Sequence, residues 1–254
     1  MKIKQYGRLI WYRAVAQLKA DTSRAYLGFL WWILEPILYM AAFYLLFETG
    51  LRAGGDNFVL FLLVGLVPWK WFSSTVMSGS NSLLANKGLI QQIYVPKYVF
   101  PLIGITINFL RFLIILALLL VFLLVYGVEV HLQWLALPVV VLVQALFILG
   151  ATCLCAALVP LVPDIRYLID NGMLFLLFLS GIFFSVRDFP DPVRQILLYN
   201  PVALLIENFR LVLLDGAWPA WGDLLRVVII SVLLIVAGFY LLGKYDRRYS
   251  KVIY

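Results

Sequence analysis

The chain has 254 residues, is 64% hydrophobic and only 13% charged, and carries a formal net charge of +7 and a mean hydropathy of +0.99. Soluble domains are about half apolar and a quarter charged, so this composition excludes an ordinary soluble protein and indicates a membrane protein. A membrane-spanning helix needs about 20 apolar residues, which leaves room for about six spans in one transmembrane domain over residues 1–254 and for no separate soluble domain.

Residues 1–26 are predicted to form an amphipathic helix that lies in the membrane interface. On a helical wheel the basic residues flank a single apolar arc, which consists of Ile3, Tyr6, Ile10, Trp11, Ala14 and Leu18. The alternative is a loosely structured basic tail. It is disfavoured because the apolar residues share one arc of the wheel and the basic residues lie on both sides of that arc. Because this basic stretch precedes the first apolar run, no cleavable signal peptide is predicted.

The apolar runs predict an all-α polytopic membrane protein with six spans. The predicted spans are residues 27–49, 58–85, 99–126, 133–159, 168–185 and 223–243. Residues 196–214 are also apolar, but Asn200-Pro201 and three further polar residues interrupt them. Irregular, polar backbone is tolerated at membrane depth only where protein or water covers it, so residues 189–221 are predicted to form a re-entrant helical hairpin.

The distribution of basic residues predicts the orientation of the chain. Both ends are rich in Lys and Arg, and the positive-inside rule therefore places both in the cytoplasm. Two cytoplasmic ends require an even number of crossings. With six crossings, thirteen Lys and Arg residues lie on the cytoplasmic side and four lie outside, namely Arg52, Arg187, Arg194 and Arg210.

Ionisable residues within spans are costly and mark either a functional path or a buried pair. The candidates are Glu35, Lys70, Arg111, Glu207 and Arg226. Glu35 precedes Pro36, which predicts a polar kink in the first span, and a structural ion pair is the alternative for this carboxylate. Lys70 is expected to face a water-filled lumen or a partner helix, while Arg226 lies close enough to a span end to reach the interface.

Aromatic residues near these charges suggest a path for a glycan. Trp32, Tyr39 and Phe43 fall within about 40° of one another on a helix, and aromatic faces let sugar rings slide without a deep energy well. The predicted substrate path consists of Trp32, Glu35, Tyr39, Phe43, Trp69, Lys70, Trp71 and Phe72. Aromatic helix packing or an interfacial belt is the alternative.

The sequence offers no catalytic or metal site. Cys153 and Cys155 point to different faces of a helix and are expected to be packing residues, while His131 lies in a polar break where solvation explains it. No phosphate-binding loop of the G-x-x-x-x-G-K-[ST] type occurs, so the chain is not expected to hydrolyse ATP itself. Residues 86–98 are too polar to span the membrane and are predicted to form a short cytoplasmic helix that docks on another protein.

Short motifs occur in order along the chain, and together they resemble a known family. They are Tyr26-Leu27-Gly28, Leu30 through Pro36, Gly65 through Trp69, Tyr94 through Lys97, Phe100-Pro101, Asp164-Ile165-Arg166, Asn200-Pro201, Arg210, Gly216 and Trp221. This ordered set resembles the membrane subunits of type-2 ABC exporters, specifically the permeases that export O-antigen and related polysaccharides such as capsule and teichoic acid. Lys70 departs from the uncharged residue usual in that family.

The resemblance implies a homodimeric, multi-pass permease of the bacterial inner membrane, with both termini cytoplasmic. A cytoplasmic ABC ATPase would bind ATP and Mg, and the substrate would be a polyprenyl-lipid-linked glycan moving from cytoplasm to periplasm. No cofactor on this chain and no nucleic-acid partner are expected. The implied coupling contacts are Leu89, Ile90, Ile93, Tyr94 and Pro96, and the implied periplasmic gate residues are Asn200, Pro201, Glu207 and Arg210.

Three other functions compete with this interpretation. A drug or small-molecule ABC exporter permease would share the fold, although the aromatic first span and short loops fit a polymer better. A membrane-embedded glycan-modifying transferase should carry a cluster of Asp, Glu or His at a membrane face, which the sequence lacks. An ion-coupled flippase should show inverted repeats of more spans.

Overall fold

The computed structural model describes residues 2–24 and 58–252, together with positions 30, 34, 37, 38 and 41. Within these residues the regular structure is entirely helical, which confirms the predicted all-α class. The first predicted span, residues 27–49, lies largely outside the described residues. The path residues predicted on it, Trp32, Glu35, Tyr39 and Phe43, are likewise outside them.

The helices follow one another closely along the chain. They are α1 (Lys2–Arg24), α3 (Phe58–Ser80), α4 (Ser82–Ala85), α5 (Lys87–Gln92), α6 (Val99–Val125), η2 (Leu132–Ala136), α7 (Leu137–Leu158), α8 (Ile165–Leu179), η3 (Val186–Asp188), α9 (Asp191–Leu198), α10 (Pro201–Leu213), α11 (Trp221–Lys244) and α12 (Asp246–Val252). The second predicted span is shorter than expected, because its helix is interrupted at Asn81.

Four of the described helices are long and apolar enough to cross a membrane, so the chain is a multi-pass membrane protein. They are α3, α6, α7 together with η2, and α11. Helix α8, which the sequence predicted as a fifth crossing, has 15 residues, and at 1.5 Å per residue it reaches about 22 Å, short of a bilayer core of about 30 Å. Helices α9 and α10 bend by 100° and would add one crossing if they formed a single broken span.

Glycines and stacked rings pack the long helices together. A Cβ on Gly150 of α7 would lie 2.7 Å from Leu234 Cβ, and one on Gly238 of α11 would lie 2.8 Å from Leu154 N. The missing side chains thus allow α7 and α11 to approach closely, as small residues do in membrane bundles. Helix α3 packs on two neighbours through stacked rings, Trp71 on Phe112 of α6 and Phe72 on Phe147 of α7.

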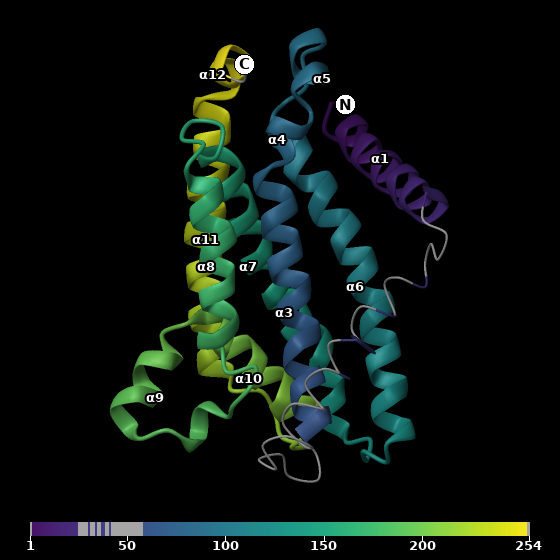
Figure 1. Cartoon of the computed structure of the whole chain (residues 1–254), viewed down its shortest axis with the longest axis vertical. Helices are drawn as coiled ribbons and strands as arrows, with labels where there is room; N and C mark the ends of the chain where they lie inside the picture. The colour runs from purple at the N-terminus through teal and green to yellow at the C-terminus, as the bar shows by residue number, and fades with distance from the viewer. Residues whose placement is uncertain are drawn as a thin grey trace.

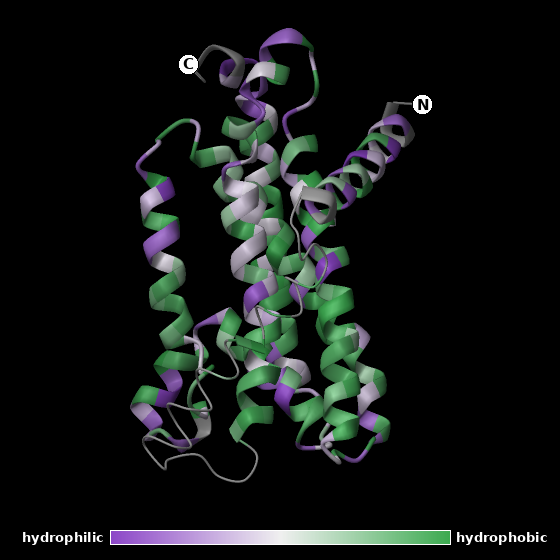
Figure 2. Ribbon diagram, turned by 45° about the vertical axis from the view of Figure 1, so that its right-hand side comes forward, coloured by the Kyte–Doolittle hydropathy of each residue, from purple (hydrophilic) through white to green (hydrophobic). Residues whose placement is uncertain are grey.

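The two ends of the bundle differ. Both chain termini, α4, α5 and α12 lie at one end, while α9 and α10 lie at the opposite end (Figure 1). We call these the terminal end and the hairpin end. Figure 2 shows apolar residues dominating the long helices between them, whereas α1 mixes polar and apolar residues along its length and runs obliquely beside the bundle.

Helix α1 confirms the helical part of the N-terminal prediction. Ala14 is fully buried, and Tyr6, Ile10 and Leu18 are partly buried on the predicted apolar arc. Trp11 departs from that arc and is 56% exposed. The buried side faces α6, so the helix packs against protein as well as presenting an amphipathic surface.

Candidate functional site

The second helix of the hairpin, α10, begins at a capped start. The Asn200 side chain accepts a hydrogen bond from Val202 N at 3.0 Å and donates one to Ser180 Oγ at 2.9 Å. Pro201 occupies the first turn of α10, where its missing N–H costs nothing and its fixed φ suits a helix. The Asn200-Pro201 pair that the sequence singled out therefore starts α10 and ties it to the end of α8.

Arg210 locks the hairpin onto the bundle. Its side chain is almost entirely buried. It donates from Nη1 to Gly181 O at 2.6 Å, from Nη2 to Ile182 O at 3.0 Å, and from Nε and Nη2 to Phe61 O at 3.3 and 3.2 Å. Its Cζ also lies 3.4 Å from the centroid of the Phe61 ring. One guanidinium therefore joins α10 to the start of α3 and to the turn after α8, using the several donors that only arginine presents in a planar fork.

The far side of the hairpin is fixed as well. Asn208 Oδ1 accepts a hydrogen bond from Ala220 N at 2.8 Å, directly before α11. At the turn after α10, Gly216 has φ +58°, and a Cβ there would lie 2.5 Å from the His131 ring. His131, which the sequence assigned to a solvated loop, thus packs against this turn. Glu207, the remaining gate residue predicted, is partly buried on α10.

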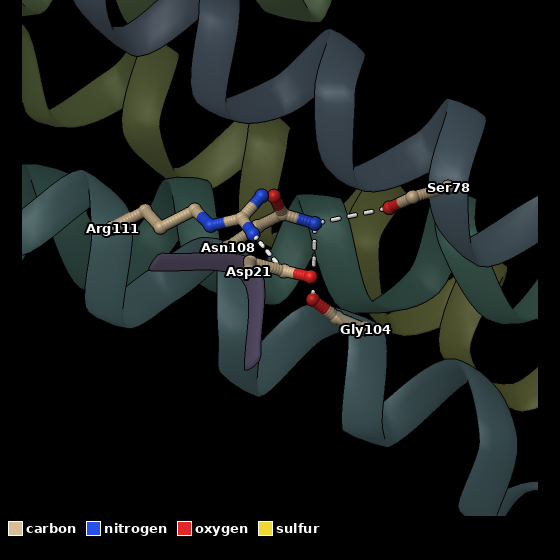
Figure 3. Close-up of polar contacts among 5 residues, drawn as sticks. All are labelled: Asp21, Ser78, Gly104, Asn108 and Arg111. Carbon is tan, nitrogen blue, oxygen red and sulfur yellow. Dashed lines mark hydrogen bonds and ion pairs between the residues drawn. The ribbon is translucent and has the colours of Figure 1, made fainter. Parts of the chain in front are cut away.

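A cavity of about 310 Å³ separates α1 from α6 and the α3–α5 region, and a polar cluster lies on its wall. Arg111 Nη2 pairs with Asp21 Oδ2 at 2.6 Å, which fastens α1 to α6 (Figure 3). Asn108 Nδ2 donates to Ser78 Oγ and to Gly104 O, both at 3.0 Å. Asp21 was missed by the sequence analysis, although it is the only acidic residue among the first 34 and was the obvious partner for a basic group in a span.

A second cavity, of about 240 Å³, lies between α3 and α8. It is lined by Leu66, Trp69, Lys70, Ser73, Met77, Asp170, Met173, Leu174 and Leu177. Lys70 thus shares a cavity with the carboxylate Asp170, which sequence reasoning did not pick out. Two neighbours of Lys70 lie elsewhere, because Trp71 and Phe72 are buried and stack on α6 and α7.

At the terminal end, α5 and the residues after it present an apolar surface. Ile93 is 51% exposed and Tyr94 is 72% exposed, whereas Leu89 and Pro96 are partly buried. Ile90, which the resemblance placed among the coupling contacts, is only 4% exposed and packs in a core with Val95 and Val99. In the described structure this side chain supports the segment from within and does not contribute to its surface.

Comparisons with known proteins match nearly the whole chain. A family model described as ABC-2 type transporter matches residues 8–214. Two proteins from Klebsiella pneumoniae, both named O-antigen export system permease protein RfbA, are 27% and 26% identical over 237 residues, covering 93% of this chain and 91% of their own. A protein of the same name from Myxococcus xanthus is 29% identical over 244 residues, covering 93% of this chain and 92% of its own.

Proposed function

The chain belongs to the ABC-2 type transporter family, and from this premise we propose that it exports a polyprenyl-lipid-linked polysaccharide from cytoplasm to periplasm in an ATP-driven complex. Membership confirms the resemblance noted in the sequence and makes the chain the transport subunit of an ABC exporter rather than a catalytic enzyme. The observation that carries the substrate class is the near full-length similarity to permeases named for O-antigen export. O-antigen is therefore the first candidate, ahead of capsule or teichoic acid.

The proposed topology has six crossings of the inner membrane with both termini in the cytoplasm. In this count α8 and the irregular residues 180–185 that follow it together form the fifth crossing. Its support is the arrangement of the two ends, since the basic termini lie at one end and the hairpin lies at the other (Figure 1). Residues 1–26 would lie at the cytoplasmic interface, and residues 189–221 would form the periplasmic gate. In that role Arg210 and Asn200 are anchors, because their side chains are occupied by hydrogen bonds within the subunit.

The proposed substrate path combines the first span with the cavity between α3 and α8. Lys70 and Trp69 would contribute to it from α3, and Trp32, Glu35, Tyr39 and Phe43 from the first span. An amine, a carboxylate and an aromatic ring around one cavity suit a glycan, which offers hydroxyl groups and apolar ring faces. Two subunits are proposed to enclose the channel.

Family membership implies an ABC ATPase partner, and we place its contact at the terminal end. Ile93 and Tyr94 are the large exposed side chains there, and exposed apolar groups beside a polar rim are typical of protein contacts. ATP and Mg would bind to this partner, and the chain itself would need no cofactor.

The test is reconstitution of the chain in proteoliposomes with and without its ATPase subunit. ATP hydrolysis and ATP-dependent movement of a polyprenyl-linked O-antigen are expected only when both subunits are present. Hydrolysis by the purified single chain, or transport of small drugs with no transport of glycan by the complex, would refute the proposal. A polyprenyl-linked monosaccharide serves as the control substrate that distinguishes polymer export from simple lipid flipping.

A further inference from the structure

A single carboxylate connects the C-terminal helix to the segment between α5 and α6. Asp246, the first residue of α12, accepts hydrogen bonds from Tyr94 Oη at 2.9 Å and from Lys97 N at 3.0 Å, although about 150 residues separate it from them. The two donors use different carboxylate oxygens. The hydrogen bond and the charge of Asp246 also raise the pKa of the Tyr94 hydroxyl. Hydrogen bonds to a charged group are stronger than neutral ones.

The segment held in this way has little regular structure of its own. Residues 93–98 form no helix, and Ile93 is extended at φ −134° and ψ 147°. Lys97 is buried, and its Nζ donates within the segment, to Val95 O at 3.2 Å. A force applied to an irregular segment is expected to deform its backbone dihedral angles, because no continuous ladder of backbone hydrogen bonds opposes the deformation. External contacts therefore decide how stiff this segment is.

The other side of α12 is anchored to the membrane bundle. Tyr249 is fully buried, and its hydroxyl donates to Ala157 O at 2.9 Å, near the end of α7. Burial raises the pKa of Tyr249 to about 12, so this donor keeps its proton at neutral pH. Tyr98 adds a direct contact, with its ring 6.2 Å from that of Phe239 on α11. The closely packed α7–α11 pair is thus linked to residues 93–98 in two ways, through α12 and directly through Tyr98.

We propose that Asp246 is a positioning residue that fixes residues 93–98 to α12, so that a displacement of this segment by the ATPase is passed to α7 and α11. This inference rests on the proposed function, since it needs a partner that moves the segment. Without the carboxylate, a larger part of the displacement is absorbed within residues 93–98, and only the Tyr98–Phe239 contact and the packing of Val95 still pass it on. In this proposal α12 transmits the displacement of residues 93–98 to the membrane helices, in addition to carrying basic residues.

The first test measures the contact itself, by hydrogen exchange of the full chain in lipid nanodiscs. Asp246→Ala removes the acceptor of the Lys97 amide, whose exchange is expected to accelerate at least about tenfold. The control is Asp223→Ala, which removes an aspartate that pairs with Arg226 within the first turns of α11, at the opposite end of that helix, and it should leave the exchange of the Lys97 amide unchanged. Unchanged exchange in Asp246→Ala overturns the proposal.

The second test measures coupling, as glycan exported per ATP hydrolysed by the reconstituted complex. Asp246→Ala is expected to keep ATP hydrolysis but to lower this ratio about two- to thirtyfold, the range produced by mutations along coupling networks. Tyr94→Phe deletes one hydroxyl from an exposed ring and keeps the fold, and it should lower the ratio in the wild type but not in Asp246→Ala. Equal ratios in Asp246→Ala and Asp223→Ala overturn the proposal, whereas a wild-type complex that moves no glycan refutes the proposed function that it needs.

Discussion

Adding one methyl group at Gly65 should loosen the hairpin. A Cβ on this residue would lie 2.7 Å from Nη2 of Arg210 and 3.4 Å from Ile206 Cγ2. Ordinary contact begins near 3.4 Å, so the guanidinium must retreat by about 0.7 Å. Its hydrogen bonds to Phe61 O, now 3.2 and 3.3 Å long, would then exceed the usual limit for such bonds.

The expected loss follows from three contributions. Overpacking costs about 1–3 kcal/mol. The two bonds to Phe61 O share one acceptor and are counted as one hydrogen bond from a charged donor, whose loss costs about 1.5–3 kcal/mol. Replacing glycine by alanine within a helix stabilises the folded state by about 0.5–1 kcal/mol and offsets part of this loss. The Gly65→Ala variant should therefore be less stable by about 2–5 kcal/mol, which lowers Tm in detergent by about 4–20 °C for a chain of this size.

Thermal unfolding followed by tryptophan fluorescence measures this effect. The matched control is Gly172→Ala in α8, where a Cβ meets nothing within 4 Å, and its Tm should stay the same or rise. In an Arg210→Ala background the added methyl has space, so Gly65→Ala should cost little there. If Gly65→Ala lowered Tm equally in the wild type and in the Arg210→Ala background, the reasoning would be refuted, because the clash would then not involve Arg210.

Two further predictions concern the terminal end and the topology. Ile93→Glu should abolish stimulation of the ATPase subunit while leaving Tm nearly unchanged, because this side chain is exposed. Ile90→Glu should lower Tm strongly, because it buries a carboxylate. A lowered Tm in both variants would argue against a docking surface at Ile93. In a background without native cysteines, single cysteines replacing Asp191 and Asp215 should react with a membrane-impermeant thiol reagent in intact cells, whereas one replacing Ser250 should react only after the membrane is opened. Labelling of the first two from opposite sides would reveal an additional crossing between them.

The amino-acid sequence by itself determined the class of the protein and most helix positions. The length of an apolar run can be read directly from the sequence, and it sets the length of a membrane-spanning helix. The spans predicted at 99–126, 133–159 and 223–243 therefore closely match α6, α7 with its preceding η2 turn, and α11. The motif set also identified the family correctly. The prediction was less accurate for residues 58–85 and 168–185, where the helices are shorter than the apolar runs. The break at Asn81 and the end of α8 before Gly181, which has φ +70°, are features of the local backbone that hydropathy does not report.

Only the tertiary structure decided which polar groups meet. The Asp21–Arg111 ion pair joins residues 90 positions apart, and Tyr94 and Asp246 are separated by 152. Pairings at such separations leave no periodic signal, because they depend on how helices cross and not on the spacing within one helix. The same reason explains Arg210, whose position the sequence marked as a gate but whose buried guanidinium clamps three backbone carbonyls at the hairpin end.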